Sequence, residues 1–362
     1  MIRLTSPVFA LSLFLAGCPA GDDDDDAAGL DEAFSAVVLH GPFSGDATLT
    51  ATSSAGVPYS EVDPLGLAGT DWAVGDGNDD FWLIGRLGTD VVRRYSWPDT
   101  SAPSLEFAAG TPTNPQVAVE CAGSIFLTRY GLGVQGGGGD VAVFGLDGSP
   151  DGRVDLSSFA EGTDGTPEPS TMVELDGTLY VGLERYDRDA GWVVDPVGKV
   201  VAIDCASREV VESWDTVPNA HVFAWENTVY VRGDGGVQEL DSGTNTFVDR
   251  VLEEDLGGEA IVVLAPTPDA WVVVSEHPDD GANTVWCLEP GGALTSLEAS
   301  PSRAWDAAVD PAGNAWISWR DHWATSEIDP GGLGVYDGTS CERTAMLDFG
   351  SDPFDVAFTG LP

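Results

Sequence analysis

Short apolar runs separated by turn residues recur along the chain from residue 71 onward. Each unit begins with an apolar segment, passes through a turn that contains glycine or aspartate, and continues into a second apolar segment with an aromatic residue. A variable loop and a hairpin complete the unit. Apolar runs this short, bounded by glycine, proline and aspartate, are typical of β-strands. Units of about 45 residues with four strands each predict a radial, all-β architecture. The units begin near Asp71, Pro115, Pro169, Asn219, Glu259, Ala304 and Pro353.

The repeat is clearest in the second and third strands of each unit. The second strands cover residues 81–84, 125–127, 179–181, 229–231, 271–274 and 315–317. The third strands cover residues 141–144, 200–204, 237–241, 285–288 and 333–337. These residues resemble the YVTN-type β-propellers, in which an aromatic-Val strand precedes a Val-x-Val-Ile-Asp strand. Residues 179–181 followed by 200–204 match that pattern best. The resemblance covers roughly residues 71–358 and implies a propeller fold more than any activity.

The two ends of the chain complete the expected ring. After six full units, one strand remains at residues 354–358, and two unassigned strands lie at residues 34–39 and 47–50. If these strands pair, they form a seventh blade and leave no open sheet edge. We therefore predict a seven-bladed β-propeller over residues 33–362, with six or eight blades as the alternatives. A parallel β-helix is the rival fold, but its repeats are about half as long.

The N-terminal residues predict that the protein is located in the cell envelope. Arg3 precedes a short apolar segment that is too short to span a bilayer, and Leu15-Ala16-Gly17-Cys18 closes it. This resembles the lipobox of bacterial lipoproteins, which implies a signal peptide over residues 1–17, acylation of Cys18 and anchoring in a lipid membrane. Pro19, in place of aspartate, implies the outer membrane, on its periplasmic or cell-surface side. A secretory signal with an unrelated cysteine is the alternative.

Charge limits the classes of partner that the chain can bind, and cysteine content predicts disulfides. Residues 18–32 include five consecutive aspartates and predict a disordered tether. The chain carries 60 acidic and 15 basic residues, a formal net charge of −45, which repels nucleic acid and therefore excludes it as a partner. We expect a monomer.

Four cysteines follow Cys18, and an even number in an exported chain favours two disulfides, with three possible connectivities. They are Cys121, Cys205, Cys287 and Cys341.

In a propeller, chain direction alternates between strands, so the connections fall on two faces. The loops after second strands and between blades share one face, and residues 129–140, 184–199, 276–283 and 320–332 make it the loop-rich face. The hairpin turns share the opposite face, the turn face, which collects the four cysteines. Because Cys121 and Cys205 fall in neighbouring blades, as do Cys287 and Cys341, we prefer these two pairings.

Arginines and aromatic residues gather on the loop-rich face. Guanidinium groups beside aromatic rings suit a carboxylate, phosphate or sugar-acid ligand. The alternative is that local ion pairs, such as Arg185 or Arg188 with Asp187 or Asp189, merely brace the loops. The candidate ligand-binding residues are Arg86, Arg129, Tyr130, Arg185, Tyr186, Arg232, His221, Arg303, Arg320 and His322.

A candidate calcium site lies in the turn at residues 147–155. Asp147, Ser149, Asp151 and Asp155 place oxygen atoms at alternating positions, and Gly152 permits a sharp bend. The pattern resembles the short calcium hairpins of integrin-type propellers, although serine replaces the usual Asp or Asn. An ordinary Asp-Gly turn is the alternative, so Ca²⁺ is the one cofactor that the sequence suggests.

No catalytic motif stands out in the chain, and we assign no catalytic residue. The sequence favours a non-enzymatic binding or scaffold module for a protein, a glycan or a small anionic ligand. The alternative is a propeller hydrolase or lactonase, since YVTN-type propellers are similar to sugar-lactone hydrolases. Such an enzyme needs acid, base or metal groups at the channel mouth, near which Glu184, His221, Glu259 and Asp352 are expected to lie.

Overall fold

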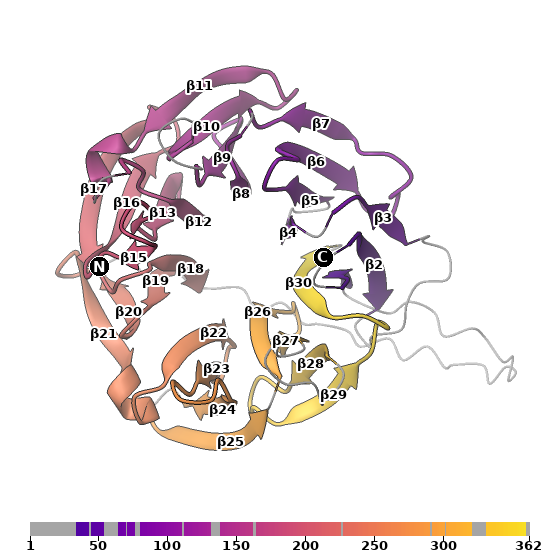
Figure 1. Ribbon diagram of the computed structural model, residues 1–362, viewed down its shortest axis with the longest axis vertical. Coiled ribbons are helices and arrows are strands. Elements are labelled where there is room, and N and C mark those ends of the chain that lie inside the picture. The colour runs from indigo at the N-terminus through magenta and orange to yellow at the C-terminus, as the bar shows by residue number, and fades with distance from the viewer. Residues whose placement is uncertain are drawn as a thin grey trace, which may run out of the picture. The chain divides into compact units, whose positions relative to one another are not determined.

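The chain divides into two units, residues 1–31 and residues 32–362. The computed structural model describes residues 34–42, 45–53, 64–69, 71–76, 80–110, 112–131, 138–161, 164–225, 227–289, 292–300, 302–320 and 331–359, all of which belong to the second unit. Seven four-stranded antiparallel sheets stand side by side around a common axis (Figure 1). The prediction of a seven-bladed β-propeller is confirmed. Cys18, the predicted signal peptide and the tether lie outside the described residues.

Six blades follow one another along the chain, each running from an innermost strand at the axis to an outermost strand at the rim (Figure 1). They are numbered in chain order. Blade 1 comprises β4 (Trp72–Asp76), β5 (Asp80–Gly85), β6 (Val91–Ser96) and β7 (Leu105–Ala108). Blade 2 comprises β8 (Pro115–Cys121), β9 (Ser124–Arg129), β10 (Asp140–Gly145) and β11 (Pro150–Asp155). Blade 3 comprises β12 (Pro169–Leu175), β13 (Thr178–Leu183), β16 (Gly198–Asp204) and β17 (Glu209–Thr216).

The next three blades repeat this order. Blade 4 comprises β18 (His221–Trp225), β19 (Thr228–Gly233), β20 (Gly236–Asp241) and β21 (Thr246–Leu252). Blade 5 comprises β22 (Ala260–Pro266), β23 (Trp271–Glu276), β24 (Asn283–Leu288) and β25 (Leu294–Ser300). Blade 6 comprises β26 (Arg303–Val309), β27 (Ala315–Arg320), β28 (Gly332–Tyr336) and β29 (Arg343–Leu347). The connections also hold a small hairpin, β14 (Tyr186–Asp187) with β15 (Val193–Val194), and two single-turn 3₁₀ helices, η1 (Ser157–Phe159) and η2 (Glu253–Leu256).

Blade 7 joins the two ends of the chain, as expected from the sequence. Its innermost strand is β30 (Pro353–Thr359), which pairs with β1 (Ser35–His40), followed by β2 (Ala47–Ser53) and β3 (Leu65–Leu67). Val37 lies opposite Ala357, and Val38 lies opposite Val356. The sequence pattern missed β3, because three residues with a central glycine give no alternation to detect.

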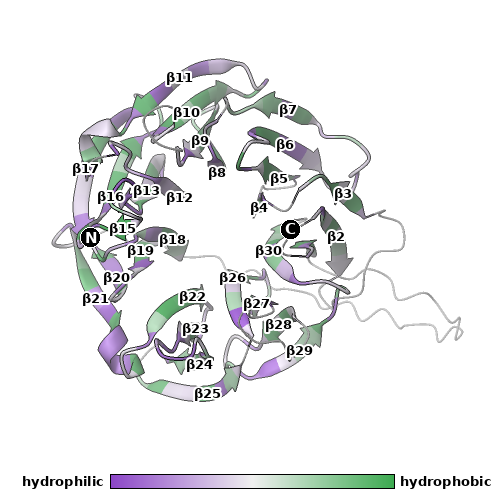
Figure 2. Ribbon diagram, viewed as in Figure 1, coloured by the Kyte–Doolittle hydropathy of each residue, from purple (hydrophilic) through white to green (hydrophobic). Residues whose placement is uncertain are grey.

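The cores lie between neighbouring blades. The second strands are buried at almost every position, because adjacent sheets cover both of their faces. Phe126 and Val143 of blade 2 pack with Leu179 of blade 3 in one such cluster. The outermost strands are apolar only in part, and Figure 2 shows mixed hydrophobic and hydrophilic segments along β11 and β21.

Side chains also link the innermost strands of adjacent blades. The Asp355 carboxylate accepts a hydrogen bond from the Val74 amide at 2.7 Å, and the Asp76 carboxylate accepts one from the Phe358 amide at 2.7 Å. Polar side chains thus satisfy backbone groups at the axial edge of the sheets, where no further strand is available.

Two disulfides connect neighbouring blades on the turn face, and both preferred pairings are confirmed. Cys121 and Cys205 join blades 2 and 3 with a Cα–Cα distance of 5.9 Å. Cys287 and Cys341 join blades 5 and 6 with a Cα–Cα distance of 5.7 Å. Among the described residues, no helix has the length and apolarity needed to cross a membrane.

Candidate functional site

Most arginines of the loop-rich face have a carboxylate partner within the fold. Arg86 lies 2.8 Å from Asp71, and Arg303 lies 3.2 Å from Glu276. Arg129 donates two hydrogen bonds to the buried Asp140 carboxylate, at 2.7 and 2.6 Å. These ion pairs agree with the interpretation that the arginines brace the loops.

Arg185 also pairs with carboxylates of the fold, and it is more deeply buried than the other paired arginines. Its side chain is 2% exposed, and its guanidinium lies 2.6 Å from Glu161 and 3.5 Å from Asp195. It also donates to the Phe159 carbonyl at 3.1 Å. Because its donors point into the protein, Arg185 holds the loop between β13 and β16 in place.

Arg303 and Arg320 form a separate group on blade 6. They are direct cross-strand neighbours at the start of β26 and the end of β27. The guanidinium of Arg320 lies 4.8 Å from the ring centre of Trp305 and 5.3 Å from that of Phe354. Arg320 is 8% exposed, so its guanidinium is largely shielded from solvent while it makes these cation–π contacts.

Polar residues from three adjacent blades converge near the axis. Tyr130 follows β9 of blade 2, Glu184 follows β13 of blade 3, and His221 begins β18 of blade 4. The Tyr130 hydroxyl donates to Glu184 Oε2 at 2.7 Å, and His221 Nε2 lies 3.5 Å from Glu184 Oε1. The Glu184 side chain is 13% exposed and that of His221 is 22% exposed, so solvent reaches this group.

Arg232 completes this group, which we call the axial cluster: Tyr130, Glu184, His221 and Arg232. Arg232 lies on β19 directly opposite His221. Burial lowers the pKa of Arg232, whereas the charges of Asp306 and Glu184 raise it. The Arg232 side chain therefore senses carboxylates of blade 3 and blade 6 as well as its cross-strand neighbour His221.

Burial sets the protonation of the axial cluster. It lowers the pKa of His221 well below its usual value, and the charge of Arg232 lowers it further. The imidazole is therefore neutral at physiological pH. Burial also raises the pKa of Glu184, although the hydrogen bond from Tyr130 opposes that change. The cluster offers hydrogen-bond donors and acceptors rather than one dominant charge.

Two further carboxyl groups face each other among the innermost strands. Asp306 of β26 and Asp355 of β30 are hydrogen-bonded to each other, which requires one of them to carry a proton. Burial and then the charge of Asp306 raise the pKa of Asp355 well above its ordinary range. Because the shared proton is used between the two carboxyl groups, the pair carries one negative charge instead of two.

A fully buried carboxyl group, Glu168, supports the axial cluster from behind. It accepts hydrogen bonds from the Thr166 hydroxyl at 2.5 Å, from the Tyr186 amide at 3.1 Å and from Arg188 Nη2 at 3.1 Å. Burial raises the pKa of Glu168 to about 8, against the lowering effects of Thr166 and Arg188.

Arg188 connects Glu168 to an aromatic surface. Its guanidinium lies 5.3 Å from the ring centres of both Tyr130 and Trp192. Trp192, in the loop that carries β14 and β15, is 59% exposed. Tyr186 packs edge to face on Trp192, with ring centres 6.3 Å apart.

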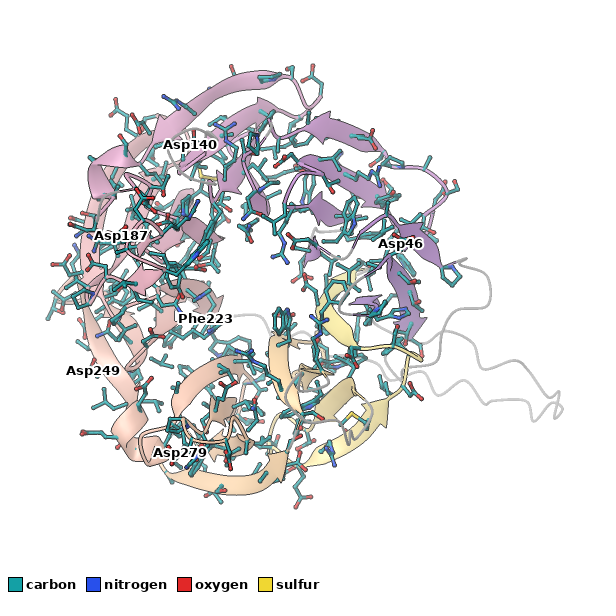
Figure 3. The ribbon with its side chains drawn as sticks, in the orientation of Figure 1. Asp46, Asp140, Asp187, Phe223, Asp249 and Asp279 are labelled. Carbon is teal, nitrogen blue, oxygen red and sulfur yellow. A yellow bond between two sulfur atoms is a disulfide. The ribbon has the colours of Figure 1, made fainter. Side chains whose placement is uncertain are left out.

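The structure thus brings together part of the predicted set. Tyr130, His221 and Arg232 share the axial cluster, and Tyr186 lies beside it through Glu168. His322 lies outside the described residues. The other candidates lie elsewhere and have partners of their own: Arg86, Arg129, Arg185, Arg303 and Arg320. Figure 3 shows side chains filling the spaces between the blades around the ring.

Sequence reasoning missed Glu168 and Trp192, and it assigned Glu184 only to the hydrolase alternative. The available signal was position: Glu168 directly precedes a first strand, and Trp192 sits in a long loop on the loop-rich face. Nothing in the sequence alone showed that Glu168 is buried.

At the candidate calcium site, hydrogen bonds occupy the carboxylates. Asp147 accepts from the Ser149 amide at 3.0 Å and from its hydroxyl at 2.5 Å. Asp155 accepts from the Ser157 amide at 2.9 Å, and Arg208 pairs with Asp151. No group of three or more His, Cys, Asp or Glu side chains placed to hold a metal ion occurs among the described residues. Calcium binding at this turn stays a prediction.

Comparison with solved structures supports the fold. The chain is similar to apo AztD from Citrobacter koseri, with a TM-score of 0.54 and 15% identity over 90% of this chain and 98% of that one. The dihydro-heme d1 dehydrogenase NirN in complex with DHE gives a TM-score of 0.51 and 14% identity over 91% of this chain and 75% of that one. Likeness at this identity shows a shared β-propeller fold and no shared activity. No family model and no curated protein matches the chain.

Proposed function

We propose that this protein is an envelope-anchored lipoprotein whose propeller binds a glycan at the axial end of its loop-rich face, without catalysis. The observation that carries this proposal is the convergence of Tyr130, Glu184 and His221 from three adjacent blades. A group built from three blades is placed by the whole ring, which gives a ligand a fixed set of hydrogen-bonding partners.

The chemistry of the axial cluster favours hydroxyl groups over charged ones. A neutral imidazole, a phenol, a partly exposed carboxyl group and the Arg232 guanidinium supply both donors and acceptors, which matches the hydroxyls of a sugar. The exposed ring of Trp192 supplies an apolar surface nearby. A small anion is less well matched, because most of the candidate arginines already have carboxylate partners and the chain carries a net charge of −45; those with ion pairs are Arg86, Arg129, Arg185 and Arg303.

The experiment is a glycan array probed with the full-length protein, followed by affinity measurements on each glycan that binds. We expect Tyr130→Phe and Glu184→Ala each to weaken binding about ten-fold, since the first removes the donor and the second the acceptor of the hydrogen bond between them. Glu209→Ala, an exposed site on β17, is the matched control and should bind normally. If no glycan binds, or if an anion binds and Arg129→Ala with Arg320→Ala abolishes that binding, the proposal is wrong.

The anchor and the repeat type belong to the same proposal. The lipobox ending at Cys18 supports acylation and outer-membrane anchoring. The best YVTN-like segments form β13 and β16, which are adjacent strands with Tyr180 opposite Ala202. In the native host, Cys18→Ala should move the protein from the membrane fraction to the soluble fraction. An unchanged distribution would argue for an ordinary secretory signal instead.

A hydrolase is the second candidate function, because Glu184 and His221 lie 3.5 Å apart in the axial cluster. A neutral imidazole beside a carboxyl group is the arrangement that a general base requires. A panel of lactones and esters tests it. Turnover that His221→Ala abolishes would establish an enzyme and overturn the non-enzymatic proposal.

A further inference from the structure

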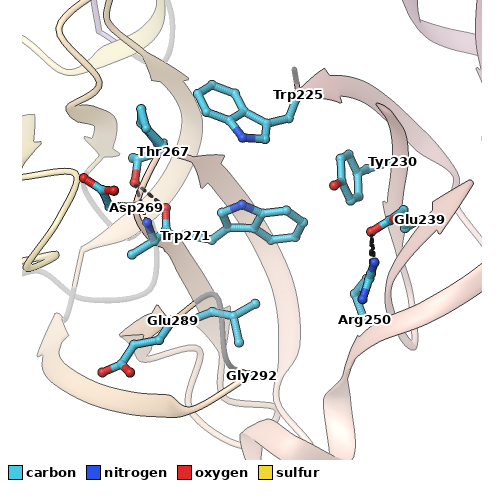
Figure 4. Close-up of a pocket in the computed structure, with 12 residues that line it drawn as sticks. Trp225, Tyr230, Glu239, Arg250, Thr267, Asp269, Trp271, Glu289 and Gly292 are labelled. Atoms are coloured by element: carbon cyan, nitrogen blue, oxygen red, sulfur yellow. Dashed lines mark hydrogen bonds and ion pairs between the residues drawn. The ribbon is translucent and has the colours of Figure 1, made fainter. Parts of the chain in front are cut away.

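A pocket of 320 Å³ lies on the turn face between blades 4 and 5. Its aromatic residues are Trp225 at the end of β18, Tyr230 on β19 and Trp271 at the start of β23. Figure 4 shows the indole of Trp271 between the side chains of Trp225 and Tyr230 and the blade 5 residues Thr267 and Asp269. The pocket is on the face opposite the axial cluster, and its volume is within the range of small-molecule sites.

The aromatic rings of the pocket meet at right angles. The ring centres of Tyr230 and Trp271 are 4.9 Å apart, with an angle of 87° between the rings. Phe223 stacks on Tyr230 at 5.3 Å and meets Trp271 edge to face at 6.3 Å, which fixes both rings from behind. Trp225 and Trp271 are half-buried, so part of each ring is open to the pocket. Tyr230, packed against both Phe223 and Trp271, is only 8% exposed, so Trp225 and Trp271 supply the ring surface that a ligand can reach.

Negative charge is in excess around these rings. Glu239 pairs with Arg250 on blade 4, so that these two charges cancel (Figure 4). Asp269 and Glu289, which are exposed, line the blade 5 side of the pocket and add two carboxylates. With a formal net charge of −45 on the chain, the pocket attracts cations and repels anions.

The blade 5 wall of the pocket is held rigidly by blade 6. The Thr267 hydroxyl donates to the Gly338 carbonyl at 2.5 Å, and the Thr339 hydroxyl donates to Asp269 Oδ2 at 3.0 Å. The Cys287–Cys341 disulfide joins the same two blades next to these contacts. The turn that carries Thr267 and Asp269 is therefore fixed before any ligand arrives, which lowers the entropic cost of binding.

We propose that this pocket binds a small, soluble organic cation that carries a quaternary ammonium group. Such a group is rounded, places its positive charge against ring faces, and needs no hydrogen-bond acceptor. Cation–π attraction extends to about 6 Å from a ring centre, and desolvated sites use several rings together. The carboxylates of Asp269 and Glu289 then add longer-range attraction at the pocket entrance.

The test is titration calorimetry of the full-length protein with choline and with 3,3-dimethylbutan-1-ol, which has the same shape without the charge. We expect choline to bind saturably and the neutral compound to bind at least about ten-fold more weakly. Trp225→Ala should weaken choline binding about ten-fold, and Trp225→Phe should recover part of that loss because a ring face is restored. Asp269→Asn should weaken it about three-fold.

Val248→Ala, on the outer strand β21 of the same blade, is the control and should bind choline normally. The melting temperature of each variant shows whether it is folded. The proposal is overturned if choline does not bind at millimolar concentration, if the neutral compound binds equally well, or if folded Trp225→Ala keeps the affinity of the natural protein. A saccharide that binds here and is lost in Trp225→Ala would also overturn it.

Discussion

The two faces of the propeller differ in how their characteristic residues are used: the arginines of the loop-rich face form ion pairs within the fold, whereas the turn face carries disulfides and half-exposed aromatic rings. On the loop-rich face, arginines are frequent, but most of them are neutralised by carboxylates of the same fold, as Arg129 is by Asp140. On the turn face, two disulfides connect blades 2 with 3 and 5 with 6, and an aromatic pocket with excess carboxylates lies beside the second of them.

This difference shows that a concentration of charge in the sequence is weak evidence for a ligand. A guanidinium group that must be buried needs a partner, and the loops supply one locally. Aromatic rings that stay half-exposed, such as those of Trp225 and Trp271, are stronger evidence, because leaving apolar surface in contact with water costs free energy.

The largest effect should come from removing a disulfide of the turn face. The pairs close segments with sequence separations of 84 and 54 residues. In the chain-entropy model, replacing either pair by serine lowers the free energy of unfolding by about 4 kcal/mol. Cys121→Ser with Cys205→Ser should cost about 0.4 kcal/mol more than Cys287→Ser with Cys341→Ser. Urea unfolding curves measure both values.

Reductant added to the natural protein should reproduce the sum of the two losses, whereas Cys18→Ser should leave the unfolding curve unchanged. If either double variant loses less than about 1 kcal/mol, covalent links do not distinguish the turn face from the loop-rich face.

The sequence predicted the blades and their order well, but it did not predict which polar side chains are buried or which aromatic rings stay exposed, and the reasons are physical. Residues 179–181 and 200–204 predicted a blade because alternation and length are local properties. Of the three possible disulfide connectivities, the adjacency of the blades favoured the two pairings that the structure shows. By contrast, the buried position of Glu168 depends on a loop that returns to it, since Tyr186 and Arg188 follow it by 18 and 20 residues, and Trp271 was assigned only to a second strand. Half-exposed rings arise where two blades meet, and no local pattern reports that geometry.

A second, pH-dependent effect should distinguish the loop-rich face. Burial raises the pKa of Glu168 from 4.5 to about 8 in the folded chain. The folded state therefore holds a proton that the unfolded state has already lost, so stability is fully present below about pH 4.5 and declines as pH rises towards 8. Across that window the slope for one proton is at most about 1.4 kcal/mol per pH unit.

Glu168→Gln, which cannot ionise, should remove this part of the pH dependence. Thermal unfolding of both proteins between pH 4 and pH 9 measures it, with the exposed Glu209→Gln as the control for the loss of one carboxylate. Parallel stability curves for the natural protein and Glu168→Gln would mean that Arg188 keeps Glu168 ionised in the folded state.

The smallest effect concerns the candidate calcium residues 147–155, which comprise the turn before β11 and β11 itself. If calcium binds there, Asp151 must exchange its ion pair with Arg208 for the cation, so the gain is partly offset. At a calcium concentration ten times Kd, mass action stabilises the fold by about 1.4 kcal/mol, which a melting curve with calcium or chelator detects. Asp151→Asn should abolish the shift. Asp241→Asn should not, because Asp241 caps an ordinary turn by accepting hydrogen bonds from the amides of Gly243 and Thr244. A melting temperature that calcium does not change, or that changes equally in both variants, would leave disulfides as the feature that stabilises this face.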